Sequence, residues 1–157
     1  LAWMLTLLVL AGCGYSRQAL IRDDIETVYV PVFDNRTFRR GLEVELTEAL
    51  IAEINMRTHL RVMPEEHADS KIVGTITELR EPVLTKTTAD QILEKQVTVH
   101  VDFSWIDLRT GRTLVKRNGL RATKDFVLPA GENIDFGKRE AFRDAARRMV
   151  QLMEKDW

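Results

Sequence analysis

The most constraining feature of the sequence is a strict alternation of apolar and polar residues between positions 97 and 105. The apolar positions are Val97, Val99, Val101, Phe103 and Trp105. A period of two places these side chains on one face of a β-strand. The residues that follow at 107–112 predict a hairpin turn in which Gly111 adopts a positive φ. Residues 113–123 then return as the partner strand, so the sequence predicts an antiparallel hairpin with one buried face.

Two other segments repeat apolar residues at helical spacing. Within 40–56 the repeated residues are Leu42, Leu46, Ala49, Leu50 and Ile54. Within 138–157 they are Phe142, Ala146, Met149, Val150 and Met153. Each set draws a single apolar stripe and therefore predicts an amphipathic helix. We expect Asp135 or Gly137 near the start of the second helix.

Three shorter strands are expected where β-branched and aromatic residues are dense, at 25–33, 60–63 and 71–80. Gly74 predicts either a weak point in the last of these or the close approach of another group. Residues 85–91 and 125–137 are expected to be loops. The order β-α-β-β-β-β-α, without repeats, predicts an α+β fold. We expect a two-layer sandwich, with two amphipathic helices packed on one face of a small mixed, mostly antiparallel sheet.

The N-terminal residues form an apolar run that ends at the only cysteine. Residues 1–12 carry no charge and are too few to span a bilayer, which takes about 20 apolar residues, but they suit the apolar region of a signal peptide. The run closes with Leu-Ala-Gly before Cys13, which resembles the lipobox of bacterial lipoproteins. We expect 1–12 to be a signal peptide that begins upstream, 13–24 a lipidated tether, and 25–157 the folded domain. A buried N-terminal helix is the alternative, which the lack of a polar face disfavours.

The sequence contains no recognisable catalytic pattern. Its histidines, His59, His67 and His100, stand apart, and no nucleophile elbow or Gly-rich phosphate loop is present. The acidic segment around His67 is more typical of a solvated turn than of a metal site. A net charge of −1 gives no support to nucleic-acid binding. We therefore expect a protein that is not an enzyme and uses neither a metal nor another cofactor.

Basic residues gather in two places. The first cluster is Arg36, Arg39 and Arg40, where positive charge opposes the dipole of the helix that follows. The second is the acid-free run 109–124, which carries Arg109, Arg112, Lys116, Arg117, Arg121 and Lys124. Both are candidate contacts for an anionic ligand, because guanidinium groups suit phosphate geometry. Solvation or pairing with nearby acids is the alternative for the first, and protection of an edge strand for the second.

Four segments together resemble the LptE family of lipopolysaccharide-assembly lipoproteins. They are Cys-Gly-Tyr at 13–15, TVYVPVFDNRTFRRGLEVELTEALIAEI at 27–54, ADSKIVGTI at 68–76 and DLRTGRTL at 107–114. The resemblance implies two helices on a small sheet and no catalytic motif. It also implies that Cys13 carries the lipid that holds the protein at the periplasmic face of the outer membrane.

The same resemblance implies a partner and a ligand. LptE-like proteins plug the large β-barrel LptD, assist its assembly and help deliver lipopolysaccharide to the outer leaflet, and family members can bind lipopolysaccharide. A lumen plug must be polar outside, which the charged residues of this chain allow. The alternative function is a lipid-anchored periplasmic binding module with a soluble or peptidoglycan partner.

Overall fold

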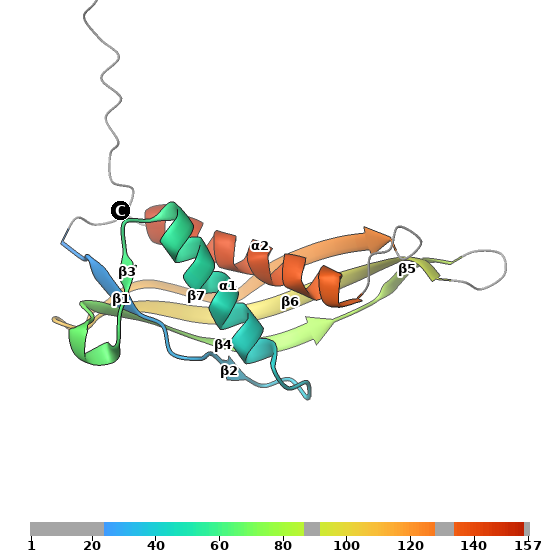
Figure 1. Cartoon of the computed structure of the whole chain (residues 1–157). Helices are drawn as coiled ribbons and strands as arrows, with labels where there is room; N and C mark the ends of the chain where they lie inside the picture. The colour runs from blue at the N-terminus through green and yellow to red at the C-terminus, as the bar shows by residue number, and fades with distance from the viewer. Residues whose placement is uncertain (1–23, 87–91, 128–133, 156–157) are drawn as a thin grey trace, which may run out of the picture.

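The computed structural model describes residues 24–86, 92–127 and 134–155. The elements follow the order β1 (Thr27–Tyr29), β2 (Asp34–Asn35), α1 (Leu42–Arg57), β3 (Arg61–Val62), the short 3-10 helix η2 (Glu65–His67), β4 (Ser70–Arg80), β5 (Val83–Lys86), β6 (Ile92–Asp107), β7 (Thr113–Val127) and α2 (Ile134–Lys155). The two helices lie on the same face of the sheet (Figure 1). The predicted two-layer α+β architecture is therefore confirmed.

The sheet is built around the long strand β6. On one side β6 pairs antiparallel with β4 and then with β5, and on its other side it pairs antiparallel with β7. The remaining pairings are parallel, since β1 lies between β3 and β4, and β2 also pairs with β4. The sheet is thus mixed and mostly antiparallel, as the sequence predicts.

The alternating residues of β6 face the helices and form the centre of the core. Val97, Val99 and Val101 are fully buried, and the apolar stripes of both helices cover them. α2 packs along β6 and β7, and α1 packs against α2. Neither described helix combines the length and the apolar character of a membrane-spanning segment. The opposite face of the sheet is polar, which an antiparallel sheet tolerates because water can solvate it.

Several element boundaries differ from those predicted. The segment 25–33 forms only the three-residue β1, and Asp34–Asn35, which follow the expected strand, pair with β4 as β2. Val83–Lys86 form a strand, although Pro82 and the polar residues after it predict a loop. β7 reaches Val127 and α2 begins at Ile134, so the expected loop is shorter at both ends. For β2, β5 and the end of β7, pairing with a neighbouring strand extends regular structure beyond the local sequence signal, whereas β1 is shorter than the apolar segment predicts.

Gly74 confirms the second of the two predictions made for it. It lies in the middle of β4, and the ring of the buried Phe33 occupies the space above it. A Cβ atom at position 74 would stand 2.7 Å from Cδ2 and 2.8 Å from Cζ of that ring. The absence of a side chain at Gly74 therefore allows the segment after β1 to close over the sheet.

A β-bulge interrupts the pairing of β6 with β7. Val101 pairs with Leu120 and Phe103 pairs with Arg117, so that two residues of β7 stand opposite the single residue Asp102. One of the two is Gly119, with a φ of 64°, whose N–H donates a 2.6 Å hydrogen bond to Oδ1 of Asp102. A bulge bends its strand and re-aims the neighbouring side chains.

Candidate anionic-ligand site

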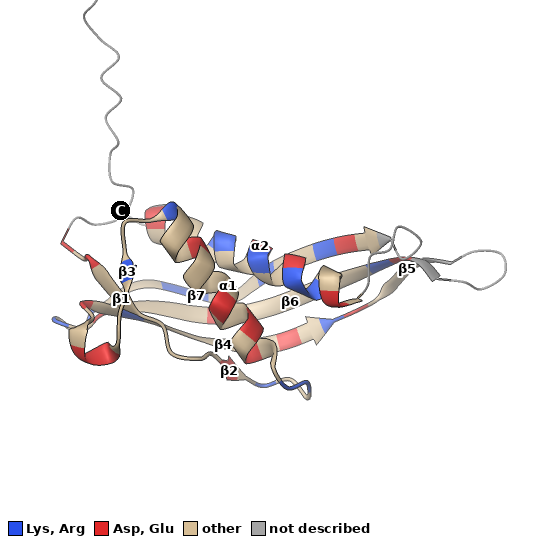
Figure 2. Ribbon diagram, viewed as in Figure 1, with Lys and Arg blue, Asp and Glu red and all other residues tan. Residues whose placement is uncertain are grey.

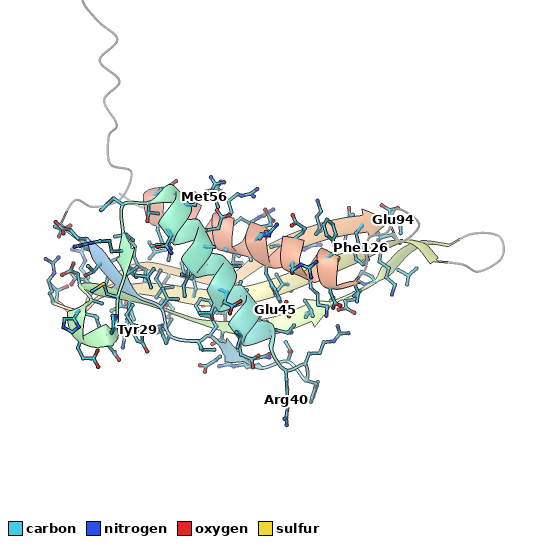
Figure 3. The ribbon with its side chains drawn as sticks, viewed as in Figure 1. Tyr29, Arg40, Glu45, Met56, Glu94 and Phe126 are labelled. Atoms are coloured by element: carbon cyan, nitrogen blue, oxygen red, sulfur yellow. The ribbon has the colours of Figure 1, made fainter. Side chains whose placement is uncertain are left out.

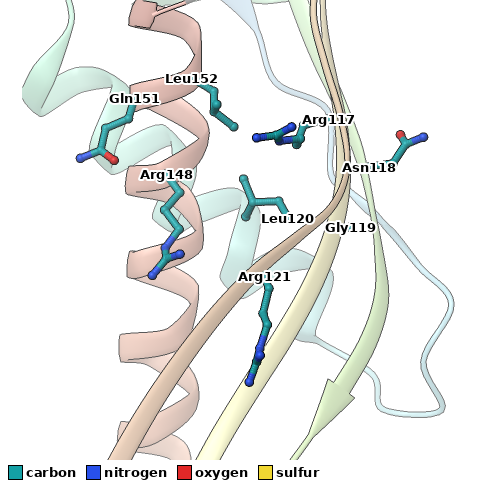
Figure 4. Close-up of a pocket in the computed structure, with 8 residues that line it drawn as sticks. All are labelled: Arg117, Asn118, Gly119, Leu120, Arg121, Arg148, Gln151 and Leu152. Atoms are coloured by element: carbon teal, nitrogen blue, oxygen red, sulfur yellow. The ribbon is translucent and has the colours of Figure 1, made fainter.

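A groove with a volume of about 520 Å³ lies between the bulged part of β7 and the C-terminal half of α2. Its lining residues come from these two elements and are Arg117, Asn118, Gly119, Leu120, Arg121, Arg148, Gln151 and Leu152. Figure 4 shows Arg117 and Leu120 extending from β7 toward α2, while Asn118 points to the other side of the strand. The groove thus combines an apolar floor with guanidinium groups.

The bulge decides how the basic residues of β7 are distributed. Arg117 stands opposite the buried Phe103 and so shares the helix face of the sheet, whereas Arg121 stands opposite His100 on the open face. Both residues reach the groove because it lies at the edge of the sheet. Lys116, opposite Ser104, belongs to the open face. The basic run is therefore divided between two faces and does not form one continuous patch.

Two of the three arginines that line the groove have no ion-pair partner among the described residues. In the described part of the chain neither Arg117 nor Arg121 forms an ion pair, and Arg148 is held by Asp144 through a 2.8 Å Nε–Oδ2 contact. Leu120 is buried and Leu152 is partly buried. Arginine binds phosphate and carboxylate oxygens in bidentate geometry. The groove therefore suits a ligand that carries anionic groups beside an apolar part.

Arg109, one of the predicted ligand contacts, forms ion pairs within and beside the β6–β7 turn. Arg109 lies 3.3 Å from Asp24 and 3.5 Å from Asp107, measured between its guanidinium nitrogens and their carboxylate oxygens. Burial raises the pKa of Asp107, but hydrogen bonds from the N–H of Arg109 and from Thr110 outweigh it and lower this pKa. Gly111 has the predicted positive φ, 70°. Arg109 thus has a structural role, while Arg112 and Lys124 are exposed without such pairing in the described chain.

The first basic cluster is separate from the groove. Arg36, Arg39 and Arg40 follow β2, which pairs with β4, so β4 and β6 lie between this cluster and β7. Figure 2 shows the blue segment before α1 and the blue tip of the β6–β7 turn well apart. Arg39 pairs with Glu81, while Arg36 and Arg40 have no ion pair among the described residues. The two clusters therefore cannot form one binding site.

Two further predictions concern residues outside the groove. Cys13, the expected lipid attachment site, lies outside the described residues. Of the acidic segment around His67, Asp69 instead binds Thr27, and Glu65 lies 3.5 Å from Lys71. Within the described ranges no group of three or more potential metal-ligating side chains comes together.

Sequence reasoning missed the contribution of α2 to the groove. Arg148, Gln151 and Leu152 occupy one side of the helix at spacings of three and four residues, outside its buried stripe. This spacing marks a common surface on α2. Only the packing of α2 along β7 shows that the surface faces Arg117 and Arg121.

Comparison with known proteins identifies a family and a fold. The family model LptE, described as lipopolysaccharide-assembly, matches residues 25–154. Among curated proteins no sequence matches the chain. The solution structure of uncharacterized lipoprotein B from Nitrosomonas europaea is similar with a TM-score of 0.58 and 15% identity, over 89% of this chain and 88% of that one.

Two further solved structures share the fold at low identity. Rare lipoprotein B from Shewanella oneidensis aligns with a TM-score of 0.53 and 12% identity, over 82% of this chain and 93% of that one. The PelC dodecamer from Paraburkholderia phytofirmans aligns with a TM-score of 0.57 and 16% identity, over 87% of this chain and 91% of that one. At these identities the similarity establishes the fold alone.

Proposed function

Because the chain belongs to the LptE family of lipopolysaccharide-assembly proteins, we propose that it is a non-catalytic outer-membrane lipoprotein that plugs an LptD-like β-barrel. In this role it assists assembly of the barrel and passage of lipopolysaccharide to the outer leaflet. The family match over residues 25–154 is the observation that carries the proposal. The lipobox-like sequence before Cys13 supports the lipid anchor, since two or more acyl chains hold a protein stably at a membrane.

The shape and surface of the domain are compatible with a plug. Its buried apolar residues form one core between the helices and the sheet, and the open face of the sheet is polar. The lumen of a large membrane barrel is also polar, so the plug can retain charged side chains at that contact. The proposal requires no conformational change and no bound cofactor.

Lipopolysaccharide fits the groove between β7 and α2 by its chemistry. Its phosphates suit Arg117 and Arg121, and its acyl chains suit the apolar surface of Leu120 and Leu152. We therefore propose this groove as the contact for the glycolipid. Lys116 and Lys124 in β7, and Arg112 just before it, add positive charge around this strand and favour the approach of an anionic ligand.

Co-purification tests the proposed partner directly. The full-length chain, expressed in its host and extracted gently with a mild detergent, is expected to bring down one large β-barrel in a fixed ratio. A Cys13→Ala variant serves as the control for the lipid anchor. Recovery of the wild-type protein without a barrel would contradict the proposal, and retention on isolated cell-wall material would favour the periplasmic binding module instead.

A further inference from the structure

The loop between β2 and α1, residues 36–41, presents a completely exposed aromatic ring. Phe38 has a relative exposure of 106%, whereas Met56, the next most exposed large apolar side chain among the described residues, has 70%. Burial of a phenylalanine side chain is strongly favourable, and this residue forgoes that gain in the isolated chain. Phe38 is also surrounded in sequence by Arg36, Arg39 and Arg40. An aromatic ring among arginines is the composition of a protein–protein hot spot.

A network centred on Asn35 fixes the conformation of this loop. The Nδ2 group of Asn35 donates to the carbonyl of Arg39 at 2.6 Å and to Oε2 of Glu43 at 2.7 Å. Its Oδ1 atom accepts hydrogen bonds from the N–H and the hydroxyl of Thr37, at 2.9 and 2.7 Å. The side chain of Asn35 thus uses both its donor and its acceptor group to hold the loop. The backbone on either side of Phe38 is therefore set before any partner binds.

Contacts with β4 and α1 tie the loop to the domain. The N–H of Arg36 donates to the carbonyl of Ile76 at 3.0 Å, and Arg39 pairs with Glu81 just beyond β4. At its other end Gly41, with a φ of 88°, is the N-cap residue that precedes α1. Figure 3 shows the side chain of Arg40 pointing away from the fold. The loop therefore presents an aromatic ring and free guanidinium groups from a rigid base.

We infer that the loop at 36–41 is a docking element that inserts Phe38 into an apolar pocket of the barrel wall, with carboxylates of the wall receiving Arg36 and Arg40. The inference rests on the proposed function and adds to it the contact that fixes the plug in the lumen. Arginine and aromatic residues are enriched at protein interfaces and lysine is depleted there, and this loop holds three arginines and no lysine.

The rigidity of the loop favours a protein partner over a lipid surface. A loop that is already ordered loses little conformational entropy on binding, so its side chains can occupy a shaped pocket at low cost. A fluid lipid surface offers no fixed pocket and gains nothing from the network around Asn35. Arg36 and Arg40, which form no ion pair among the described residues, are complementary in charge to acidic groups on the partner.

Site-specific photo-crosslinking in the host tests this contact. The full-length chain carries a photoreactive phenylalanine analogue at position 38, and a matched variant carries it at position 56, because Met56 is exposed at the far end of α1 (Figure 3). We expect position 38 to yield an adduct with the barrel, mapped by mass spectrometry to a lumen-facing segment that contains Asp or Glu. Position 56 is expected to yield much less of this adduct.

Substitutions separate the docking contact from the plug function as a whole. Phe38→Ala is expected to lower the amount of co-purified barrel by about tenfold, and Phe38→Leu to restore part of it. Arg40→Glu is expected to weaken the complex, and exchange of the mapped carboxylate for arginine in the barrel to restore it. Arg147→Glu, an exposed arginine on α2 without an ion pair in the described chain, is the charge control.

The outcomes are distinguishable. If wild-type protein brings down the barrel but Phe38→Ala brings down as much, the inference is wrong while the proposed function stands. Adducts from position 38 with lipid only, or with a second copy of the chain only, also overturn the inference. If wild-type protein brings down no barrel, the proposed function itself fails.

Discussion

The aromatic ring of Phe33 occupies the space that a side chain at position 74 would need. Phe33 is buried, and Cδ2 and Cζ of its ring lie within 2.8 Å of the place of a Cβ atom on Gly74. Real Cβ atoms do not approach carbon so closely, and the segment between β1 and β2 cannot retreat without exposing Phe33. This contact packs the segment between β1 and β2 against β4, within the sheet.

Gly74→Ala is therefore expected to destabilise the fold by about 1–3 kcal/mol, the usual cost of overpacking a core. Urea unfolding measured by circular dichroism checks this change. Phe33→Leu in the Gly74→Ala background makes room for the new methyl group, so the two substitutions together should cost less than the sum of each alone. Additive costs would show that the ring and position 74 do not interact.

The carboxylate of Asp69 accepts several hydrogen bonds and is expected to make the stability of the fold depend on pH. Its Oδ2 atom accepts hydrogen bonds from the hydroxyl of Thr27 at 2.8 Å and from the N–H groups of Thr27 and Glu26 at 3.1 and 3.2 Å. The Thr27 hydroxyl, these N–H groups and the charge of Arg109 lower the pKa of Asp69 against the opposing effect of burial. The carboxylate of Asp69 is therefore protonated less readily in the folded state than in the unfolded state.

Asp69→Asn should reduce both stability and its dependence on pH. A carboxyl whose pKa is lowered by folding stabilises the protein above its unfolded pKa, near 3.9, and this contribution is lost as pH falls through the folded value. We expect a loss of roughly 1 kcal/mol at pH 7 and a shallower decline of unfolding free energy between about pH 5 and pH 2. Urea titrations at several pH values measure both effects. Asp34→Asn is the control, since this side chain accepts no hydrogen bond within the described residues. An identical pH profile for Asp69→Asn and wild type would contradict the prediction.

The arginines of the groove should control binding of an anionic amphiphile. Arg117→Glu with Arg121→Glu is expected to weaken binding of a bisphosphorylated glycolipid by about tenfold or more, because two guanidinium contacts of the groove become repulsive. The midpoint of thermal unfolding should change little, because both side chains are exposed. Fluorescence titration in detergent micelles measures the affinity.

A matched pair of substitutions separates the groove from general charge. Arg61→Glu with Arg143→Glu makes the same change in net charge at exposed positions outside the groove. This control should bind the glycolipid nearly as well as wild type. Equal weakening by both pairs would assign the effect to net charge, and no weakening by the groove pair would assign its arginines to protection of the edge strand.

Cys13→Ala tests the proposed anchor. Without the thiol no thioether can form, so we expect an unprocessed and unacylated precursor. Intact-mass spectrometry of protein from the natural host measures the leader and the acyl groups. Ser16→Ala, three residues further on, should mature normally. Normal processing of the Cys13→Ala variant would rule out the lipobox.

The β6–β7 hairpin could be predicted from the sequence because its signal is local. The alternation from Val97 to Trp105 fixes which face is buried, and Gly111 marks the turn. β5 could not be predicted this way, since its residues are few and directly follow Pro82. It exists as a strand because β6 extends beyond the end of β4 and offers it a partner.

The candidate site was only partly predictable for a related reason. The charges of Arg117 and Arg121 are evident in the sequence, but their separation onto two faces depends on the bulge at Gly119. The dipeptide Asn118-Gly119 is a turn signal that could have indicated this irregularity. Arg148 joins the groove through the packing of two elements, β7 and α2, whose contact no local pattern encodes.

The bulge opposite Asp102 also affects whether two copies of the protein can pair through the edge of β7. Within the described chain β7 pairs on one side only, with β6, and would otherwise present a long straight border. The extra residue interrupts the regular spacing of backbone hydrogen-bonding groups along this edge. An extended segment of a second copy would therefore meet two short stretches of β7 that differ in register. Copies of the protein at high local concentration are therefore less able to join edge to edge into a continuous sheet.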